Sequence, residues 1–289
     1  MRSNAIIRIV VFSLAILVLL GIGTAILSFN LFITDGKVQL DNTVDKVEAL
    51  EQLQMENITP DIRNIEIEWV AGSITFQKDP DVTDISVHEF SPVDSKYQMI
   101  CKQSGQTLKI QFSEDEFEAI SFGINDIVSK NLVITVPSDW ECNSLEIDTA
   151  SAEVIMNDLT IQEFDFDGAS GECRMTDCEI GKLDIDTASG DVKFSGTLET
   201  LDCDAASADC TIEVTNIPRY IRMDAMSGDL ELILPPSAGF TCTLDAMSSS
   251  FDTDFECELE NSTYICGDSA CQIQVSALSG DVSILKGIE

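Results

Sequence analysis

Hydrophobic and polar residues alternate with a period of two through most of the chain from residue 61 onward. Leu183 and Ile185, for example, alternate with Asp184 and Asp186, and the alternation resumes at Val192 after a short T-A-S-G segment. A period of two is typical of a β-strand that buries one face. A few small residues between two strands leave room only for a tight corner. The pattern therefore predicts a unit of two short strands joined by a corner.

This unit recurs at a nearly fixed period. Copies begin at residues 145, 164, 183, 201 and 221, so successive starts lie 18 to 20 residues apart, and further copies begin at 242 and 273. A fixed period of this length indicates a supersecondary unit stacked on copies of itself. The few residues left over in each repeat cannot hold a crossover helix. We therefore predict an all-β fold, a single-stranded parallel β-solenoid with coils of about 19 residues. An antiparallel meander is the alternative that also accepts alternating strands.

Less regular copies of the unit precede the clear repeats. The segment W-V-A-G-S-I-T-F at 69–76 has the same strand, corner and strand pattern, with Gly72 at the corner. Further strand patterns cover residues 85–89, 97–102, 107–112 and 132–136. We expect the solenoid to span residues 61–289, with irregular early coils over 61–144, regular repeats over 145–254, and an insertion and a last coil over 255–289.

The N-terminus carries an apolar run without charge from Ile9 to Thr34, preceded by Arg2 and Arg8. A run of this length can cross a bilayer as one helix. The positive-inside rule then predicts a single-pass protein of the cell membrane, with residues 1–34 as cytoplasmic tip and transmembrane helix and the C-terminal domain outside the cell. A cleaved signal peptide is the alternative, because small residues at 23–25 resemble a cleavage site.

Residues 35–60 are polar and predict a stalk between the membrane and the solenoid. Val44, Val47, Leu50 and Leu53 fall at helical spacing within it. This spacing indicates a short helix with a packing role.

The charge of the chain is far from balanced. Its 289 residues include 51 acidic and 16 basic ones, which gives a formal net charge of −35. A chain of this charge repels phosphate backbones, so nucleic acid is excluded as a partner. Cationic partners or metal ions are the natural complement.

Many of these acids fall at equivalent places in the repeats. If Leu183 and Ile185 point inward, the acids beside them point outward, and neighbouring coils repeat them. The predicted two-column array is Glu146, Asp148, Asp165, Asp167, Asp184, Asp186, Asp202 and Asp204. Neighbours in a column stand about 4.8 Å apart, so each pair repels by roughly 1 kcal/mol in water.

Two interpretations of this array remain open. The first is a cation-binding face that collects divalent cations such as calcium, or cationic peptides, although the Gly-Gly-x-Gly-x-Asp spacing of calcium-binding rolls is absent. In the other interpretation, the outer column is a solvated face. The second column, which Asp224 and Asp245 continue, then accepts hydrogen bonds from backbone N–H groups of the corner.

The sequence predicts no catalytic and no cofactor-binding residue. His88 is the one histidine, and it lies in a strand pattern without a metal-binding or phosphate-binding motif around it, which favours a structural role. Paired carboxylates could serve a polysaccharide-active enzyme. Here, however, the acids follow the repeat, whereas a catalytic set would depart from it. An enzyme is therefore the least favoured class.

The ten cysteines allow two interpretations, disulfide bonds and packing in the core. Four take the places of apolar core residues in the repeats and are expected to be reduced: Cys173, Cys203, Cys210 and Cys242. Three more, Cys257, Cys266 and Cys271, lie close together in the insertion, where a bridge would staple a loop with little core. Any disulfide is therefore expected in the insertion or between Cys101 and Cys142.

The order of these features resembles the bacterial putative-adhesin domain family of unknown function. The resemblance rests on the apolar N-terminal helix, V-A-G-S-I-T-F at 70–76, L-V-I-T-V-P at 132–137 and the repeated S-G-D-V. It implies a surface-exposed solenoid. We therefore expect a non-catalytic, membrane-anchored binding module, an adhesin or envelope scaffold, whose partner is an envelope polymer, a cationic peptide or another membrane protein. The alternative is an envelope stress sensor or regulatory accessory that responds to cations or cationic peptides.

Overall fold

The computed structural model describes residues 51–54, 61–91, 98–113, 129–248 and 250–287. Residues 51–289 form one compact unit, separate from residues 1–50. All the elements of the described part are strands, so the fold is all-β as predicted. Within that part, no helix is long and apolar enough to cross a membrane. The predicted transmembrane helix lies outside the described residues.

The strands of the N-terminal half are β1 (Glu51–Gln54), β2 (Asn64–Asp79), β3 (Ser86–Ser91), β4 (Ile100–Ser104), β5 (Thr107–Gln111), β6 (Lys130–Pro137), β7 (Glu141–Asn157), β8 (Thr160–Gly168) and β9 (Cys173–Thr187). Those of the C-terminal half are β10 (Val192–Ser207), β11 (Cys210–Val214), β12 (Tyr220–Ser227), β13 (Leu230–Leu234), β14 (Phe240–Ser248), β15 (Phe251–Thr253), β16 (Cys257–Glu260), β17 (Thr263–Cys266), β18 (Cys271–Ser279) and β19 (Val282–Lys286).

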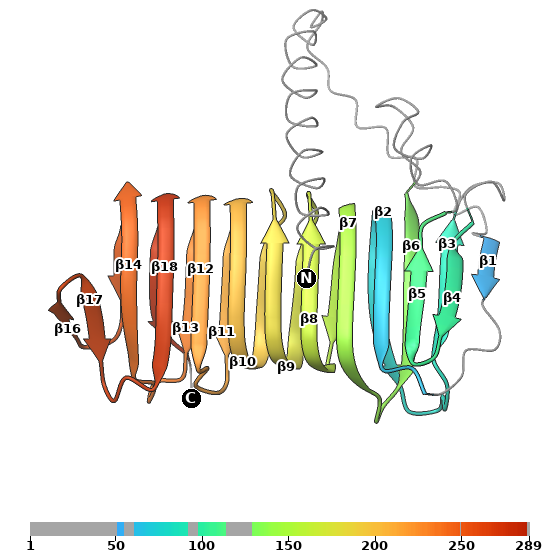
Figure 1. Ribbon diagram of the computed structural model, residues 1–289, viewed down its shortest axis with the longest axis horizontal. Coiled ribbons are helices and arrows are strands. Elements are labelled where there is room, and N and C mark those ends of the chain that lie inside the picture. The colour runs from blue at the N-terminus through green and yellow to red at the C-terminus, as the bar shows by residue number, and fades with distance from the viewer. Residues whose placement is uncertain (1–50, 55–60, 92–97, 114–128, 249, 288–289) are drawn as a thin grey trace, which may run out of the picture. The chain divides into compact units, whose positions relative to one another are not determined.

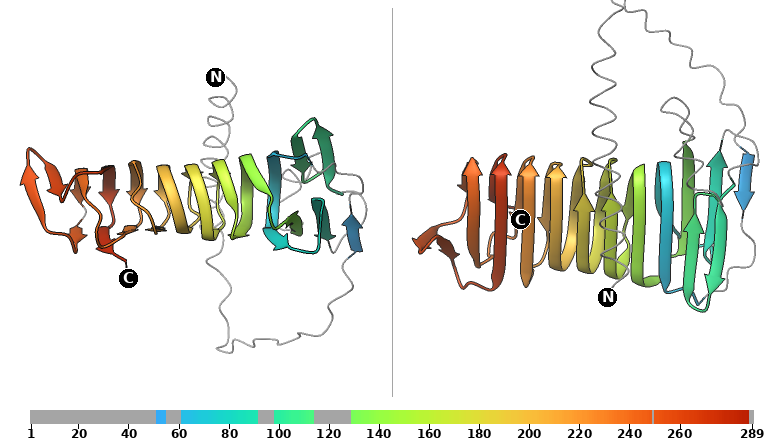
Figure 2. Two further views of the ribbon diagram at one scale, coloured as in Figure 1. Left: turned by 90° about the horizontal axis from the view of Figure 1, so that it is seen from below. Right: turned by 45° about the horizontal axis from the view of Figure 1, so that its top comes forward.

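The coils stack as parallel strands in the register that the repeats predict (Figure 1). Leu145 of β7 pairs with Phe164 of β8, which pairs with Leu183 of β9, which pairs with Leu201 of β10. All four side chains are buried, at 1% exposure or less. Stacking identical positions keeps one continuous apolar core. Two further views show the strand layers that enclose it (Figure 2).

The corner glycines are required by close contact between coils. Gly228 has φ 120°, and a Cβ placed on it would lie 2.1 Å from the carbonyl oxygen of Ala208 in the coil before it. Gly280 repeats this geometry with φ 112° against the carbonyl oxygen of Gly228. Only glycine combines such a φ with this backbone approach. The recurrent glycine of the repeat therefore sets how closely the corners stack.

The order of the coils in the stack differs from their order in the chain. β18 lies between β12 and β14, with parallel pairing on both sides (Figure 1). Its continuation β19 lies in the same way between β13 and β15. At the other end, β2 lies between β7 and the pair β5 and β6. The first and last coils of the chain are therefore internal, each clamped by neighbours on two sides.

Antiparallel strands cover both ends of the stack. The hairpin of β16 and β17 pairs with β14 at one end, and at the other β3 pairs with β6 and β1 pairs with β3. Such hairpins cover an open edge that could otherwise recruit another chain. Since β1 is a strand, the helix predicted from the spacing of the stalk residues is wrong at Leu53. The rest of the predicted stalk, 35–50 and 55–60, lies outside the described residues.

A buried ion pair anchors the N-terminal end of the stack. Lys130 Nζ lies 2.8 Å from Glu89 Oε1, and the two side chains are 0% and 1% exposed. The ammonium also donates to the carbonyl oxygen of Phe112 and lies 3.9 Å from the centre of the Phe112 ring. Glu89 accepts a second hydrogen bond, from the Met99 backbone N–H at 2.6 Å. Each charge therefore has several partners, which buried charges require.

The cysteines follow the sequence prediction. Cys257 and Cys266 form a disulfide that joins β16 to β17 in the insertion. The four cysteines at repeat positions are buried and free, as are Cys142, Cys178 and Cys271. Cys101 is free and half-buried. The bridge therefore staples the hairpin that has the least core of its own, while the repeat cysteines pack as small apolar residues.

Candidate functional site

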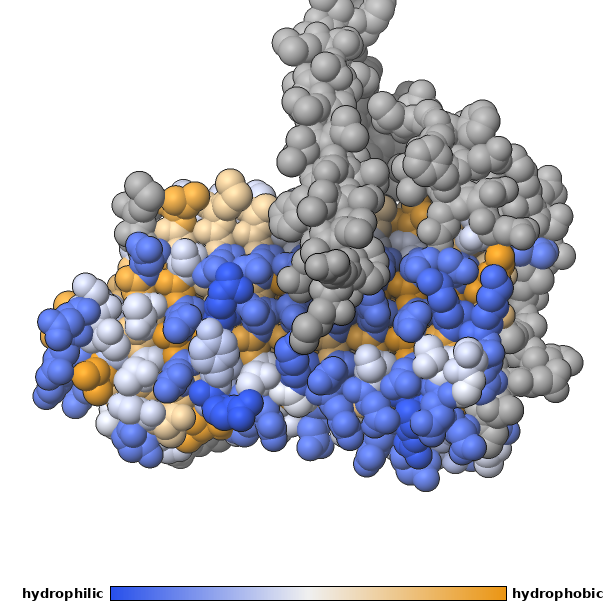
Figure 3. Space-filling view, in the orientation of Figure 1, coloured by the Kyte–Doolittle hydropathy of each residue, from blue (hydrophilic) through white to orange (hydrophobic). Residues whose placement is uncertain are grey.

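The predicted acids form a continuous array on one face of the stack. Glu146 pairs in register with Asp165, Asp165 with Asp184, and Asp184 with Asp202. The second column follows the same strands two residues later, from Asp148 through Asp167 and Asp186 to Asp204. The structure therefore brings all eight predicted residues together. A band of hydrophilic residues crosses the front of the stack (Figure 3).

The array extends one coil further than the repeats indicate. Glu66 of β2 pairs with Glu146, and Glu68 with Asp148. We call the resulting ten residues the acidic ladder: Glu66, Glu68, Glu146, Asp148, Asp165, Asp167, Asp184, Asp186, Asp202 and Asp204. The segment I-E-I-E at 65–68 carries the signal in the sequence. Glu66 and Glu68 were not predicted as part of the array, because a long segment separates β2 from β7 in the chain and the sequence does not indicate that the two strands are neighbours.

A basic residue lies at each end of the acidic ladder. Lys109 of β5 places Nζ 2.5 Å from Glu68 Oε1, and Gln111 donates to the other oxygen of Glu68 at 2.7 Å. At the far end, Arg222 of β12 contacts Asp202 at 2.5 Å, Asp204 at 3.0 Å and also Asp224. Between these ends, Lys182 Nζ reaches Asp184 at 3.3 Å with 54% of its side chain exposed. The repulsion is thus partly offset at the ends.

The electrostatic cost is greatest where burial adds to repulsion. Burial, together with the charges of Glu146, Glu68 and Asp165, raises the pKa of Asp148 to about 6. Burial and then the charge of Glu66 also raise the pKa of Glu146. Asp148 Oδ1 is buried and accepts no hydrogen bond from the described residues. This part of the acidic ladder favours a bound proton or a bound cation.

At two corners the structure shows which group accepts the hydrogen bond from a backbone N–H, and it is not an aspartate of the second column. The N–H of Ala152 donates to the hydroxyl of Thr149 at 2.9 Å, and the N–H of Gly190 donates to that of Thr187 at 3.1 Å. Each threonine directly follows a second-column aspartate and points inward, because alternate residues of a strand point to opposite sides. The prediction that the aspartates accept these bonds is therefore wrong at these two corners.

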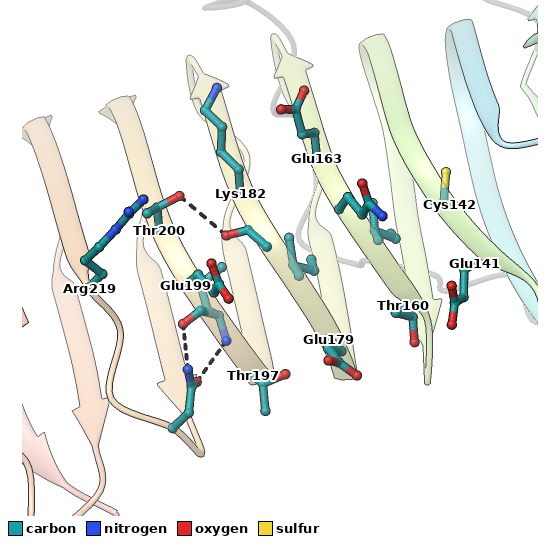
Figure 4. Close-up of a pocket in the computed structure, with 16 residues that line it drawn as sticks. Glu141, Cys142, Thr160, Glu163, Glu179, Lys182, Thr197, Glu199, Thr200 and Arg219 are labelled. Carbon is teal, nitrogen blue, oxygen red and sulfur yellow. Dashed lines mark hydrogen bonds between the residues drawn. The ribbon is translucent and has the colours of Figure 1, made fainter.

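A groove of about 790 Å³ runs beside the acidic ladder, across the first residues of β7 and β8 and the middle of β9 and β10 (Figure 4). Asn216, from the loop between β11 and β12, forms one end and is fixed by two hydrogen bonds of 2.9 Å to the backbone of Leu198. Gly181 allows the neighbouring coils to stack closely under the groove, because a Cβ there would lie 2.7 Å from the carbonyl oxygen of Gln162. The sequence did not predict this groove, because no residue of the repeat indicates that the loop between β11 and β12 folds back onto β10.

The groove offers charges of both signs but no reactive nucleophile. The charged residues along it are Glu141, Glu163, Glu179, Glu199, Lys182 and Arg219. Burial raises the pKa of the Cys142 thiol to about 12, which keeps it protonated and unreactive. Within the described part, no three His, Cys, Asp or Glu side chains converge in a way that could hold a metal ion. His88 lies apart on β3, opposite Val133 of β6.

Comparison with known proteins gives a family and a set of solved structures. The model of the Toastrack DUF4097 family matches residues 62–285. A putative adhesin from Bacteroides fragilis is 12% identical, with a TM-score of 0.48, and the match covers 82% of this chain and 97% of that one. A putative cell adhesion protein from Clostridium sporogenes is 10% identical, with a TM-score of 0.37 and coverage of 82% and 100%. A putative lipid binding protein from Parabacteroides distasonis is 14% identical, with a TM-score of 0.37 and coverage of 84% and 98%. No curated protein matches the chain.

Proposed function

Because the chain belongs to the Toastrack DUF4097 family, whose domains have no assigned function, we propose its function from its own surface. We propose that it is a non-catalytic, membrane-anchored binding module of the cell envelope, an adhesin or scaffold, that binds cationic groups of an envelope polymer or peptide along the acidic ladder. The observation that carries this proposal is the unbroken register of ten carboxylates over five neighbouring strands.

The register itself makes cation binding favourable. Carboxylates about 4.8 Å apart repel each other by roughly 1 kcal/mol in water, and by more where they are partly buried. Burial, together with this repulsion, raises the pKa of Asp148 to about 6. A cation with charges at similar spacing relieves the repulsion on several strands at once. Calcium ions would do so by binding along the columns, shared between neighbouring carboxylates.

The chemistry of the described surface supports the non-catalytic part of the proposal. The groove beside the acidic ladder carries no accessible thiol, since Cys142 is buried. The acids of the ladder follow the repeat, whereas a catalytic set would depart from it. A repeated array of carboxylates is suited to multivalent binding.

The membrane anchor belongs to the same proposal. The apolar run from Ile9 to Thr34 would hold the solenoid outside the cell, where cationic peptides and envelope polymers occur. Protease added to intact cells should then digest the exposed loops of the solenoid. Full protection of the solenoid in intact cells, and digestion only after permeabilisation, would contradict this topology.

Thermal melting of the full chain tests cation binding. Millimolar calcium chloride should raise the melting temperature by more than sodium chloride of equal ionic strength. Replacing Asp165, Asp184 and Asp202 by asparagine should remove the difference, because the outer column loses three of its five carboxylates. A matched control replaces three acids outside the ladder, Glu213, Glu231 and Glu258, by glutamine.

The control variant should keep the full calcium effect. An equal response of the wild-type chain to the two salts would leave only general screening. In that case the acidic ladder would serve solubility, and calcium would be excluded as a ligand.

A further inference from the structure

A column of apolar residues runs beside the acidic ladder on the same face. Thr187, Ala205, Ala225 and Ala277 pair in register across β9, β10, β12 and β18, and the residue after each of them points outward. We call these four outward residues the apolar ridge: Ala188, Ala206, Met226 and Leu278. Apolar residues are visible along the upper edge of the face above β14, β18 and β12 (Figure 3).

The apolar ridge has a large and exposed end. Met226 is 61% exposed and Leu278 is 47% exposed, whereas most other large apolar side chains of the described part are buried. Toward β9 the same column narrows to alanine, which leaves a shallow strip beside Asp186 and Asp204. An exposed apolar patch with a polar border is typical of a surface that binds another molecule.

The negative charge beside the apolar ridge indicates which kind of molecule binds there. A second copy of the chain would bring the same carboxylates against this face, and like charges disfavour that contact. An anionic lipid surface would be repelled in the same way. A partner with apolar residues and basic residues on adjacent stripes would satisfy both columns. An amphipathic helix has this arrangement.

The dimensions of a helix also fit the stack. Neighbouring coils lie about 4.8 Å apart, and one turn of an α-helix rises about 5.4 Å. A helix lying along the stack would therefore place about one apolar residue on each coil of the ridge. Long lysine or arginine side chains on its flank would accommodate the small mismatch and reach the second column of the acidic ladder.

From these observations we propose that the apolar ridge is the docking site for a cationic amphipathic helix of a partner protein or peptide. Its apolar stripe packs on Met226 and Leu278 and continues over Ala206 and Ala188. Its basic flank faces Asp204 and Asp186, which lie beside those two alanines. This inference rests on the proposed function, because it specifies the kind of cationic partner that the acidic ladder receives.

Two synthetic peptides test the proposal on the full chain in nonionic detergent. The first has 16 residues of leucine and lysine with leucine at helical spacing, and the second has the same composition in a scrambled order without a stripe. Fluorescence anisotropy measures the affinity of each, with detergent alone as the blank. The wild-type chain should bind the striped peptide about tenfold more tightly than the scrambled one, because only the striped peptide buries the ridge.

Matched variants locate the effect. Replacing both Met226 and Leu278 by serine should abolish the preference and leave binding of the scrambled peptide unchanged. Leu259→Ser is the control, because Leu259 is equally exposed, at 62%, but lies on β16. Melting curves verify that each variant is folded.

The outcomes separate this inference from the proposed function. Equal affinity of the wild-type chain for both peptides, or a preference that survives in the double variant, would overturn the docking site and leave cation binding intact. Failure to bind either peptide would overturn both. Loss of association with phosphatidylglycerol nanodiscs in the double variant would assign the ridge to a membrane and overturn the helix.

Discussion

At Asp148, folding buries a carboxylate beside other carboxylates, and both effects oppose its ionisation. Its pKa is raised to about 6 by burial and by neighbouring carboxylates, whereas an exposed aspartate titrates near 4. The folded state therefore binds the proton more tightly than the unfolded state does. It follows that this residue costs stability above pH 6, and that the cost disappears as the pH falls through the interval from 6 to 4.

Asp148→Asn should accordingly stabilise the chain at pH 7.5 by about 1–2 kcal/mol, a value discounted for partial solvent screening. Below pH 4 the stabilisation should vanish. Urea unfolding at several pH values measures both. Asp204→Asn is the matched control in the same column, because Asp204 accepts hydrogen bonds from Arg222 and its loss should not stabilise the fold. Destabilisation by Asp148→Asn at pH 7.5 would show that the acidic ladder is not under strain there.

Glu89 illustrates the opposite case, a buried charge with all its partners in place. Glu89→Gln would leave the ammonium of Lys130 buried without its counter-charge, which costs about 3–5 kcal/mol. Chemical denaturation measures this loss. Lys182→Met removes one partner of an exposed pair with Asp184 and should cost less than about 1 kcal/mol. Similar effects of the two variants would mean that the interior pair is solvated.

The glycine at each corner determines how closely neighbouring coils stack. Gly228→Ala should lower the free energy of unfolding by about 3 kcal/mol or more, because the new Cβ meets a backbone carbonyl and the φ angle suits glycine alone. Gly105, in the turn between β4 and β5, has φ 61° and open space around it. Gly105→Ala should therefore cost only about 1–2 kcal/mol. If the two substitutions cost the same in denaturant titrations, close stacking does not explain the corner glycine.

The strands and their register could be predicted from the sequence because each repeat carries its own alternation. Which coils lie next to each other in the stack could not be predicted. Identical units give no signal of which neighbour each one chooses, so the place of β18 between β12 and β14 depends on the intervening hairpin. The spacing around Leu53 satisfied a helix, yet pairing of β1 with β3 prevailed. Tertiary pairing overrides a short local pattern of this kind.

At the scale of the whole molecule, the same stacking that builds the core also builds the candidate site. The eight predicted acids came together because their register follows from the core, whereas Glu66, Glu68 and the groove at Asn216 depend on contacts between distant segments. The place of β2 beside β7 makes the acidic face continuous from β2 to β10. In the described part this face has no convergent metal site but many charges at repeated positions.

Calorimetric titration of the full chain with octalysine tests the central claim, that cationic groups bind along the acidic ladder. The wild-type chain should bind the peptide at low salt, with an affinity that falls steeply as sodium chloride is added. Replacement of Asp165, Asp184 and Asp202 by asparagine should weaken binding at least tenfold, while replacement of Glu213, Glu231 and Glu258 by glutamine should change it by less than about twofold. Equal weakening by the two triple variants would mean that octalysine responds only to net charge, and would contradict the account.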